Sequence, residues 1–357
     1  MKILIGIATL KRGGAERVVS LLTNEWALNH NVTVALFDGT DQAYSIGGDL
    51  VVLGSKSSKS ILGKIFEFYR RVSWIKGLIN NIKPDRVFTF AESANLPFIK
   101  ASKSCGTLSH LIISIHNPPL KVNKLNHYFM KRWYPDVKKI VVVGEELREE
   151  VAAFLTINRN KTIHIPNPIS LKDISKQIHP SIHIHKKPFL LGMGRLTEQK
   201  GFDLLIKTFA SISEKINVDL LIYGNGHLRG DLINQIKKLK MENRIFLRQS
   251  TDKPFLILSQ SKLLILSSRY EGWGLVLAEA MGCKTPVISF DCPVGPRQIL
   301  DKGKYGLLVP EGNTHLLAKA ILNIIDNEKL QNHFVKSGYE RAKEFDVKRV
   351  APEWLYL

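Results

Sequence analysis

Short apolar runs alternate with amphipathic segments of helical length along the chain, and this alternation constrains the fold more than any other feature. The apolar runs are rich in valine, isoleucine and leucine, which is typical of buried strands. Strands are predicted at residues 2–9, 32–37, 86–91, 111–116, 139–143, 189–194, 219–223, 245–247, 262–267 and 285–290. Helices are predicted at residues 15–29, 61–82, 93–102, 145–155, 201–215, 227–240, 275–282 and 314–325. Continuous apolar strands separated by helices predict parallel, doubly wound α/β sheets that are buried on both faces.

Four prolines between residues 166 and 188 interrupt the alternation and indicate two domains in the 357-residue chain. We predict a first domain at 1–168, a linker at 169–187 and a second domain at 188–345. The segment 346–357 ends in an apolar tail that we expect to dock on the first domain. Because ligands bind at the carboxyl ends of strands in such sheets, we expect the two domains to face each other across a ligand cleft.

Composition narrows the class of protein. No apolar run approaches the ~20 residues that span a bilayer, so we expect a cytoplasmic protein. The three cysteines, Cys105, Cys283 and Cys292, have no metal-ligand or redox spacing and are interpreted as reduced thiols. The formal net charge of +19 favours anionic partners.

Two basic clusters with interleaved aromatic and aliphatic residues lie in the first half of the chain. The first cluster contains Lys56, Lys59, Lys64, Arg70, Arg71, Lys76 and Lys83, and the second contains Lys121, Lys124, Lys131, Arg132, Lys138 and Lys139. A solvated helix face accounts for each cluster on its own. Their shared position favours an anionic membrane surface as a partner and a peripheral location on the inner face of the cell membrane.

Glycine and charge gather in the loops that follow predicted strands. Gly13 and Gly14 form a strand–helix turn that lets backbone approach a ligand, although a tight turn needs glycine in any case. Arg195 and Lys200 lie between a strand and a helix, where they suit phosphate oxygens or simply remain on the surface. The segment Tyr223-Gly224-Asn225-Gly226 reads only as a turn.

The most specific loop runs from residue 268 to residue 280 and holds two glutamates eight positions apart. Glu271 lies in the glycine-rich part with Gly272 and Gly274, and Glu279 lies in the helix that follows. The backbone N–H groups at the helix start suit a phosphate, and carboxylates accept hydrogen bonds from sugar hydroxyls. A loop charge followed by an ordinary helix glutamate is the plainer interpretation.

Taken in order, these motifs resemble glycosyltransferase family 4 over nearly the whole chain. They are Gly-Gly-Ala-Glu, Gly-Arg-Leu-x-x-x-Lys-Gly, Gly-x-Gly-x-Leu and Glu-Gly-x-Gly-Leu-x-x-x-Glu-Ala. The resemblance implies a GT-B fold, with two Rossmann-like doubly wound domains, and sugar transfer with retention of configuration. It also implies a nucleotide-sugar donor and a glycan or lipid-linked acceptor bound by the first domain, in lipopolysaccharide or O-antigen biosynthesis.

The resemblance implies a role for each matching residue. Arg195 and Lys200 match the pair that neutralises the donor diphosphate, Glu271 matches the glutamate on the donor sugar, and Glu279 matches the one on the ribose. His116 matches a histidine facing the transferred sugar. The remaining donor-binding candidates are Gly13, Gly14, Gln249, Gly272, Gly274, Leu275 and Val276. Residues 291–296 resemble a subgroup that uses UDP-hexoses or UDP-N-acetylhexosamines, whereas Arg248 and Gln298 depart from the usual residues.

Three other interpretations remain open. A sugar-nucleotide epimerase of the same fold is disfavoured by the glutamate pair, and a nucleic-acid-binding protein lacks any recognisable motif. A catalytically silent partner subunit is disfavoured by the intact charged residues. No Asp-x-Asp occurs in the chain, so we expect a UDP-sugar donor to be used without a cofactor and without a metal ion.

Overall fold

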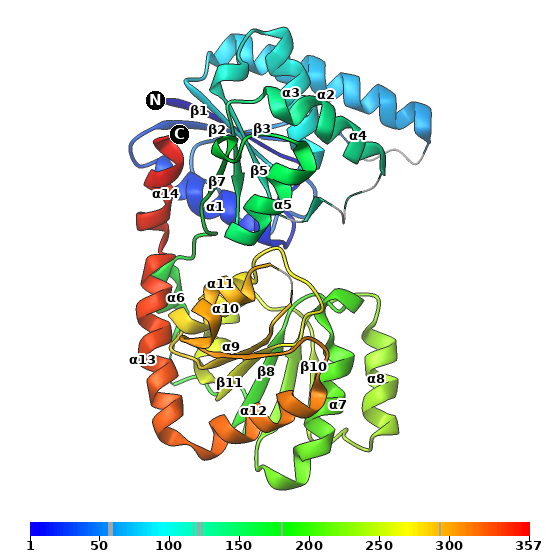
Figure 1. Cartoon of the computed structure of the whole chain (residues 1–357), viewed down its shortest axis with the longest axis vertical. Helices are drawn as coiled ribbons and strands as arrows, with labels where there is room; N and C mark the ends of the chain where they lie inside the picture. The colour runs from blue at the N-terminus through cyan, green and yellow to red at the C-terminus, as the bar shows by residue number, and fades with distance from the viewer. Residues whose placement is uncertain (56–59, 117, 120–121, 123, 180, 293) are drawn as a thin grey trace. The chain divides into compact units, whose positions relative to one another are not determined.

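The computed structural model describes residues 1–55, 60–116, 118–119, 122, 124–179, 181–292 and 294–357. The chain divides into two compact units (Figure 1). Unit 1 contains Met1–Pro168 and Val347–Leu357, and unit 2 contains Ile169–Asp346. Lys56, Lys59, Lys121, Pro180 and Pro293, which belong to the basic clusters, the predicted linker and the 291–296 motif, lie outside the described residues.

Unit 1 is built on a seven-stranded parallel sheet with the order β3-β2-β1-β4-β5-β6-β7. Its strands are β1 (Lys2–Ile7), β2 (Asn31–Leu36), β3 (Asp49–Val52), β4 (Arg86–Phe90), β5 (Leu111–Ile115), β6 (Lys139–Val142) and β7 (Thr162–His164). Its helices are α1 (Gly14–Trp26), α2 (Ile61–Ile82), α3 (Glu92–Ser104), α4 (Lys124–Trp133), α5 (Glu145–Leu155) and α14 (Val347–Leu355). Single 3₁₀ turns lie at Leu108–His110, Tyr134–Asp136 and Arg159–Lys161.

Alternate residues of β1 show how both faces of this sheet are buried. Ile3 and Ile5 belong to a core that also contains side chains of α1 and α14. On the opposite face, the Cα of Gly6 lies against the ring of Phe98 of α3, so no side chain fits there. Figure 1 accordingly shows α2 and α3 over one face and α1 with α14 over the other. Burial on both faces is why these strands are continuous apolar runs.

Unit 2 is built on a six-stranded parallel sheet with the order β10-β9-β8-β11-β12-β13. Its strands are β8 (Phe189–Met193), β9 (Asp219–Tyr223), β10 (Ile245–Arg248), β11 (Leu263–Leu266), β12 (Val287–Phe290) and β13 (Leu307–Val309). Its helices are α6 (Leu171–Gln177), α7 (Phe202–Ile212), α8 (Arg229–Lys238), α9 (Pro254–Gln260), α10 (Leu275–Gly282), α11 (Pro296–Ile299), α12 (Thr314–Asp326) and α13 (Glu328–Glu344). Single 3₁₀ turns lie at Glu198–Lys200, Ser213–Lys215 and Asp301–Gly303. In each unit the strand order reverses direction beside the first strand, which is the doubly wound topology.

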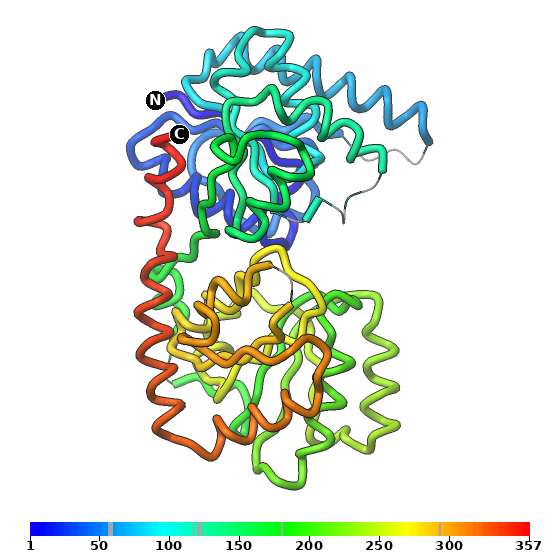
Figure 2. Tube along the Cα trace, in the orientation of Figure 1, coloured from blue at the N-terminus to red at the C-terminus, as the bar shows by residue number. Residues whose placement is uncertain are grey.

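The last helix, α14, returns to unit 1, so both chain ends lie in that unit (Figure 2). The Trp354 ring is 1% exposed and packs between those of Phe88 and Phe90, at centroid distances of 5.9 and 5.3 Å. The Trp26 indole Nε1 donates a hydrogen bond of 3.0 Å to the Ala351 carbonyl. Burial of one large aromatic side chain contributes about 3 kcal/mol, which accounts for the docking of such a short helix.

Some elements differ from the predictions. The predicted linker 169–187 contains α6, and its Ile174 packs against α10 at Gly282, so the segment belongs to unit 2. The strands β3, β7 and β13 and the helices α4, α9, α11, α13 and α14 were not predicted. Each of these strands is three or four residues long and lies at a sheet edge, and a segment this short shows no hydrophobic period.

Candidate active site

The glycine-rich loops of unit 2 come together at the carboxyl edge of its sheet. The loop after β8 is joined to the loop after β9, because the Leu196 amide donates to the Asn225 carbonyl at 2.9 Å. It is also joined to the loop after β11, because the Arg269 amide donates to the Gln199 carbonyl at 2.8 Å. Three of the four sequence motifs therefore form one surface.

Two glycines make this close approach possible. A Cβ on Gly224 would lie 1.9 Å from the Gly194 carbonyl oxygen, closer than any real contact. Gly201 adopts a φ of +59°, and its Cβ would lie 2.1 Å from the Ser267 carbonyl oxygen. The glycines of the second and third motifs thus serve loop-to-loop packing.

Lys200 and Glu271 form a buried ion pair at the centre of this surface. Lys200 Nζ lies 2.5 Å from Glu271 Oε1, and their side chains are 15% and 6% exposed. The Ser268 hydroxyl donates a second hydrogen bond of 2.6 Å to the same oxygen. Because the pair is desolvated, each charge depends on the other for compensation. The structure brings together two side chains that lie 71 positions apart in the sequence.

Arg195 is exposed, and among the described residues its guanidinium bonds to no side chain other than the neutral Gln199, to which Nη2 donates at 3.3 Å. Its charge is therefore open to solvent and available to an anion. Sequence reasoning missed Arg269, which makes a bidentate ion pair with Asp203 at 2.9 and 2.7 Å. It also donates to the Glu198 carbonyl at 2.7 Å and so fixes the loop that carries Lys200.

Helix α10 begins beside this ion pair. Gly274 caps it with a φ of +94°, and the Leu275 and Val276 amides are first-turn donors without an acceptor inside the helix. Glu279 lies one turn further along and is buried at 6% exposure. Gly272 is half-buried in the preceding loop. The partial positive charge of the helix start therefore lies next to the Lys200 and Glu271 loops.

Cys292 also lies near the pair, although no spacing in the sequence pointed to it. Burial, together with the charges of Glu271 and Glu311, raises the pKa of this thiol to about 12. The thiol is neutral at physiological pH and acts as packing. Gln249 lies further away, exposed in the loop after β10, which is tied to the β9 loop by a 2.9 Å bond between Asn225 and Ser250.

His116 follows β5 at the carboxyl edge of the unit 1 sheet and is 9% exposed. Burial lowers the pKa of this imidazole to about 4, so it is neutral at physiological pH. Its Nε2 lies 3.0 Å from the Ser114 hydroxyl oxygen. Because that hydroxyl donates to the Thr89 carbonyl, Nε2 carries the proton and Nδ1 is left as an acceptor.

Gly13 and Gly14 begin α1 at the same sheet edge as His116. A Cβ on Gly14 would meet nothing within 4 Å, so the backbone there faces open space. A Cβ on Gly13 would meet the Glu16 carboxylate, to which the Thr9 hydroxyl donates at 3.3 Å. Gly13 is thus needed for local packing, whereas Gly14 leaves room for a ligand.

The described residues contain neither a clustered metal site nor a helix that could span a membrane. No group of three or more histidine, cysteine, aspartate or glutamate side chains with metal-site geometry occurs among them. None of the helices in the described part of the chain is long and apolar enough to cross a membrane.

Two doubly wound, parallel-sheet domains in one chain are the arrangement of the GT-B fold, and solved structures share this fold. Anabaena HepE, crystallised with UDP and glucose, is 20% identical and superposes with a TM-score of 0.82 over 100% of this chain and 98% of its own. A lipopolysaccharide outer core galactosyltransferase, WaaB, is 21% identical with a TM-score of 0.75, covering 99% of this chain and 98% of its own.

Sequence comparisons then identify the family. The model for glycosyl transferases group 1 matches residues 173–341, and the model for Glycosyltransferase Family 4 matches residues 12–173. The chain belongs to family 4 of the glycosyltransferases. An N-acetylgalactosamine-N,N'-diacetylbacillosaminyl-diphospho-undecaprenol 4-alpha-N-acetylgalactosaminyltransferase of Campylobacter jejuni is 26% identical, over 99% of this chain and 98% of its own. The amylovoran biosynthesis glycosyltransferase AmsD of Erwinia amylovora is also 26% identical, over 96% of this chain and 95% of its own.

Proposed function

We propose that the protein transfers a hexose or N-acetylhexosamine from a UDP-sugar to a glycan or lipid-linked acceptor, with retention, in cell-surface polysaccharide biosynthesis. The observation that carries the proposal is the buried Lys200–Glu271 pair, with the exposed Arg195 and the start of α10 beside it. Relatives that span the whole chain support the acceptor class, since one acts on a diphospho-undecaprenol-linked glycan.

In this proposal, unit 2 binds the donor. The donor diphosphate lies against Arg195, Lys200 and the amides of Leu275 and Val276, which stabilise the negative charge that develops as the anomeric C–O bond breaks. Glu271 accepts hydrogen bonds from the donor sugar and Glu279 from the ribose.

The reaction then proceeds on one face of the sugar. The acceptor oxygen bonds to the anomeric carbon on the side from which the UDP oxygen leaves, and the acceptor proton passes to that phosphate oxygen. This route needs no protein nucleophile, and the cations of the donor loops supply the charge that a metal ion would otherwise provide.

The test is incubation with a panel of UDP-sugars, with UDP release as the readout, in the presence and absence of membrane lipid extract. We expect release to depend on the extract, to follow one or two hexose or N-acetylhexosamine donors, and to persist after extensive EDTA treatment. The anomeric configuration of the product, measured by NMR, should match that of the donor. Activity that is lost in EDTA and restored by Mn²⁺, or an inverted product, would contradict this mechanism.

The location proposed is the inner face of the cell membrane, with the protein held peripherally through α2 and α4. These neighbouring helices, joined by the Phe68 and Trp133 rings at 6.1 Å, carry a cluster of exposed apolar side chains. The cluster consists of Ile61, Leu62, Ile65, Phe66, Tyr69, Leu125 and Tyr128, each 50% exposed or more. Exposed Lys64, Lys124, Lys131 and Arg132 lie on the same two helices. Apolar side chains among cations suit an anionic bilayer surface.

Replacing Leu62 and Phe66 by glutamate should abolish binding to vesicles that contain phosphatidylglycerol. Inserting two large side chains contributes about 3 kcal/mol, so the partition coefficient should fall by roughly 100-fold. Co-sedimentation at low salt measures this, with Leu28→Glu and Tyr356→Glu as controls on other exposed apolar positions of unit 1. Equal binding by the wild type and the double variant would rule out this face.

A further inference from the structure

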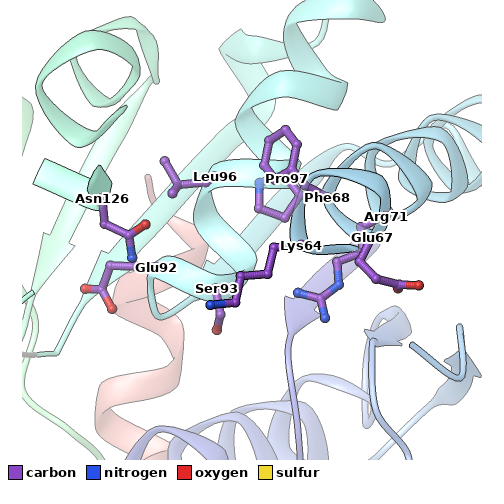
Figure 3. Close-up of a pocket in the computed structure, with 9 residues that line it drawn as sticks. All are labelled: Lys64, Glu67, Phe68, Arg71, Glu92, Ser93, Leu96, Pro97 and Asn126. Carbon is purple, nitrogen blue, oxygen red and sulfur yellow. The ribbon is translucent and has the colours of Figure 1, made fainter. Parts of the chain in front are cut away.

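Unit 1 contains a pocket of about 190 Å³ between α2, α3 and α4 that no sequence motif indicated. Figure 3 shows its lining side chains: Arg71 of α2 lies at one end, Glu92 of α3 and Asn126 of α4 lie at the other, and the Lys64 ammonium of α2 lies between them beside Ser93. Phe68, Leu96 and Pro97 form the apolar part of the wall. The pocket is thus cationic on its α2 side, acidic at the start of α3 and apolar along one wall.

The acidic end is held in a strained arrangement. Ala91 links β4 to α3 with a φ of +66° and a ψ of 157°, a conformation that residues with a side chain rarely adopt. It places Glu92 at the first position of α3, with Oε1 buried and without a hydrogen-bond partner among the described residues. Burial raises the pKa of this carboxyl group. A buried acceptor without a donor is unfavourable for folding alone, so it points to a ligand.

At the cationic end, burial lowers the pKa of Arg71, whereas the nearby carboxylates of Glu67 and Asp38 raise it. Arg71 donates from Nε to the Ser55 hydroxyl at 3.0 Å, and its guanidinium lies 4.7 Å from the centre of the Phe37 ring. In the described part of the chain, no carboxylate forms an ion pair with Arg71 or Lys64. The nearby Glu67 is already bound by the Ser55 hydroxyl at 2.5 Å and by Arg70 at 3.0 Å. Figure 3 shows Lys64 and Arg71 directed toward the start of α3 and the Glu67 carboxylate directed away.

Hydrogen bonds that begin one helical turn beyond Glu92 lead to the candidate residue His116. Asn95, one turn after Glu92, accepts from the Thr89 hydroxyl at 2.7 Å and donates to the Ser114 carbonyl at 2.9 Å. The Ser114 hydroxyl in turn lies 3.0 Å from His116 Nε2. The pocket and His116 therefore share the carboxyl edge of β4 and β5, where ligands of such sheets bind.

We propose that this pocket binds the terminal saccharide of the acceptor, with Glu92 accepting a hydrogen bond from a sugar hydroxyl and Lys64 and Arg71 holding a phosphate joined to that sugar. The inference rests on the proposed function, because it assigns the acceptor of that reaction to a phosphorylated saccharide. Carboxylates pair with sugar hydroxyls, and the arginine fork and the lysine ammonium pair with phosphate oxygens. The apolar wall suits the C–H face of a sugar ring.

The position of the pocket explains how such an acceptor is presented. Lys64 lies on α2 among the exposed apolar side chains of Ile61, Leu62, Ile65 and Phe66. A phosphate held at this end therefore has apolar surface next to it, which suits a lipid chain attached to the phosphate. The sugar then extends toward Glu92 and the sheet edge.

The test measures binding of glucose 1-phosphate, glucose and inorganic phosphate to the full chain by ligand-detected NMR. The variants are Glu92→Gln and Lys64→Ala, with Glu353→Gln as the control, because Glu353 is another unit 1 carboxyl whose pKa is raised by burial. Glu92→Gln should weaken both glucose 1-phosphate and glucose about tenfold, the effect of losing one hydrogen bond to a charged group. Lys64→Ala should weaken glucose 1-phosphate and inorganic phosphate but not glucose. Glu353→Gln should change nothing.

Affinity for UDP, measured on the same variants, reports whether each one is folded and separates the two proposals. The assignment of the pocket is supported if Glu92→Gln and Lys64→Ala lose the affinities expected of them and keep the UDP affinity of the wild type. Equal sugar binding in the wild type and Glu92→Gln, or inorganic phosphate binding as tightly as glucose 1-phosphate in every variant, overturns it while leaving donor binding intact. A wild-type chain that binds none of the UDP-sugars overturns the proposed function, and with it the acceptor role of this pocket.

Discussion

Lys200→Ala is expected to lower turnover by about 10²- to 10³-fold, the usual effect of removing one group that stabilises developing charge. Lys200 is the only one of the two cations in its motif that is largely buried, and its ammonium lies 2.5 Å from the Glu271 carboxylate. In the proposed reaction, the charge of this desolvated lysine acts on the leaving diphosphate with little screening. Arg195 is exposed, so Arg195→Ala should cost less than Lys200→Ala.

The same substitution should also destabilise unit 2, and this must be separated from catalysis. Removing Lys200 leaves Glu271 buried without its cation, which costs about 3–5 kcal/mol. The double variant Lys200→Met/Glu271→Gln carries no buried charge, and Ser268 still donates to position 271. We expect the double variant to recover most of the lost stability and none of the lost turnover.

Thermal unfolding and UDP release measured on the wild type, Lys200→Met, Glu271→Gln and the double variant Lys200→Met/Glu271→Gln give a complete cycle. A double variant that regains both stability and turnover would show that the pair serves only the fold. Equal stability of all four proteins would show that the ion pair is not desolvated in solution.

Gly224→Ala should destabilise unit 2 by about 3 kcal/mol and abolish detectable UDP binding. The added methyl group would lie 1.9 Å from the Gly194 carbonyl oxygen, so the loops after β8 and β9 must separate. Their separation moves the segment between Gly194 and Lys200, which carries both candidate phosphate ligands. The expected fall in melting temperature is roughly 10 °C for a unit of this size.

Gly230→Ala is the matched control for this prediction. Gly230 lies in α8, six positions further along, and a Cβ there would meet nothing within 4 Å. This variant should keep its UDP affinity and gain up to about 1 kcal/mol, since alanine is the better helix former. If Gly224→Ala keeps the UDP affinity of the wild type, the contact between these loops is not needed for donor binding.

Much of the molecule could be predicted from the sequence because its signals are local. The continuous apolar runs at β1, β8 and β11 report burial on both sheet faces, and this established the parallel doubly wound class. The three glycine-rich motifs of unit 2 lie directly after strands of one parallel sheet, and parallel strands end at one edge, so the convergence of these three motifs followed from the chain order alone.

The short edge strands and α6 were missed because three to seven residues carry too little periodicity to be distinguished from loop. Arg269 lies in the loop from residue 268 to residue 280, but no role could be predicted for it, because its partner Asp203 lies 66 positions away. Only the contacts of Arg269 in the folded protein show that this residue fixes the loop that carries Lys200.

The sequence by itself determined the fold class, the family and which loops carry the charged residues, because these depend on residue type and spacing along the chain. Tertiary structure alone decided that Lys200 and Glu271 are paired and buried, and that Arg195 remains in solvent. Only the tertiary structure shows that Glu92, at the start of α3, lines a pocket with residues of α2 and α4 and has a buried Oε1 atom. The burial of a charged side chain and its ion-pair partners depend on residues that are distant in sequence. Burial and pairing together determine whether the charge is solvated, compensated or available to a ligand.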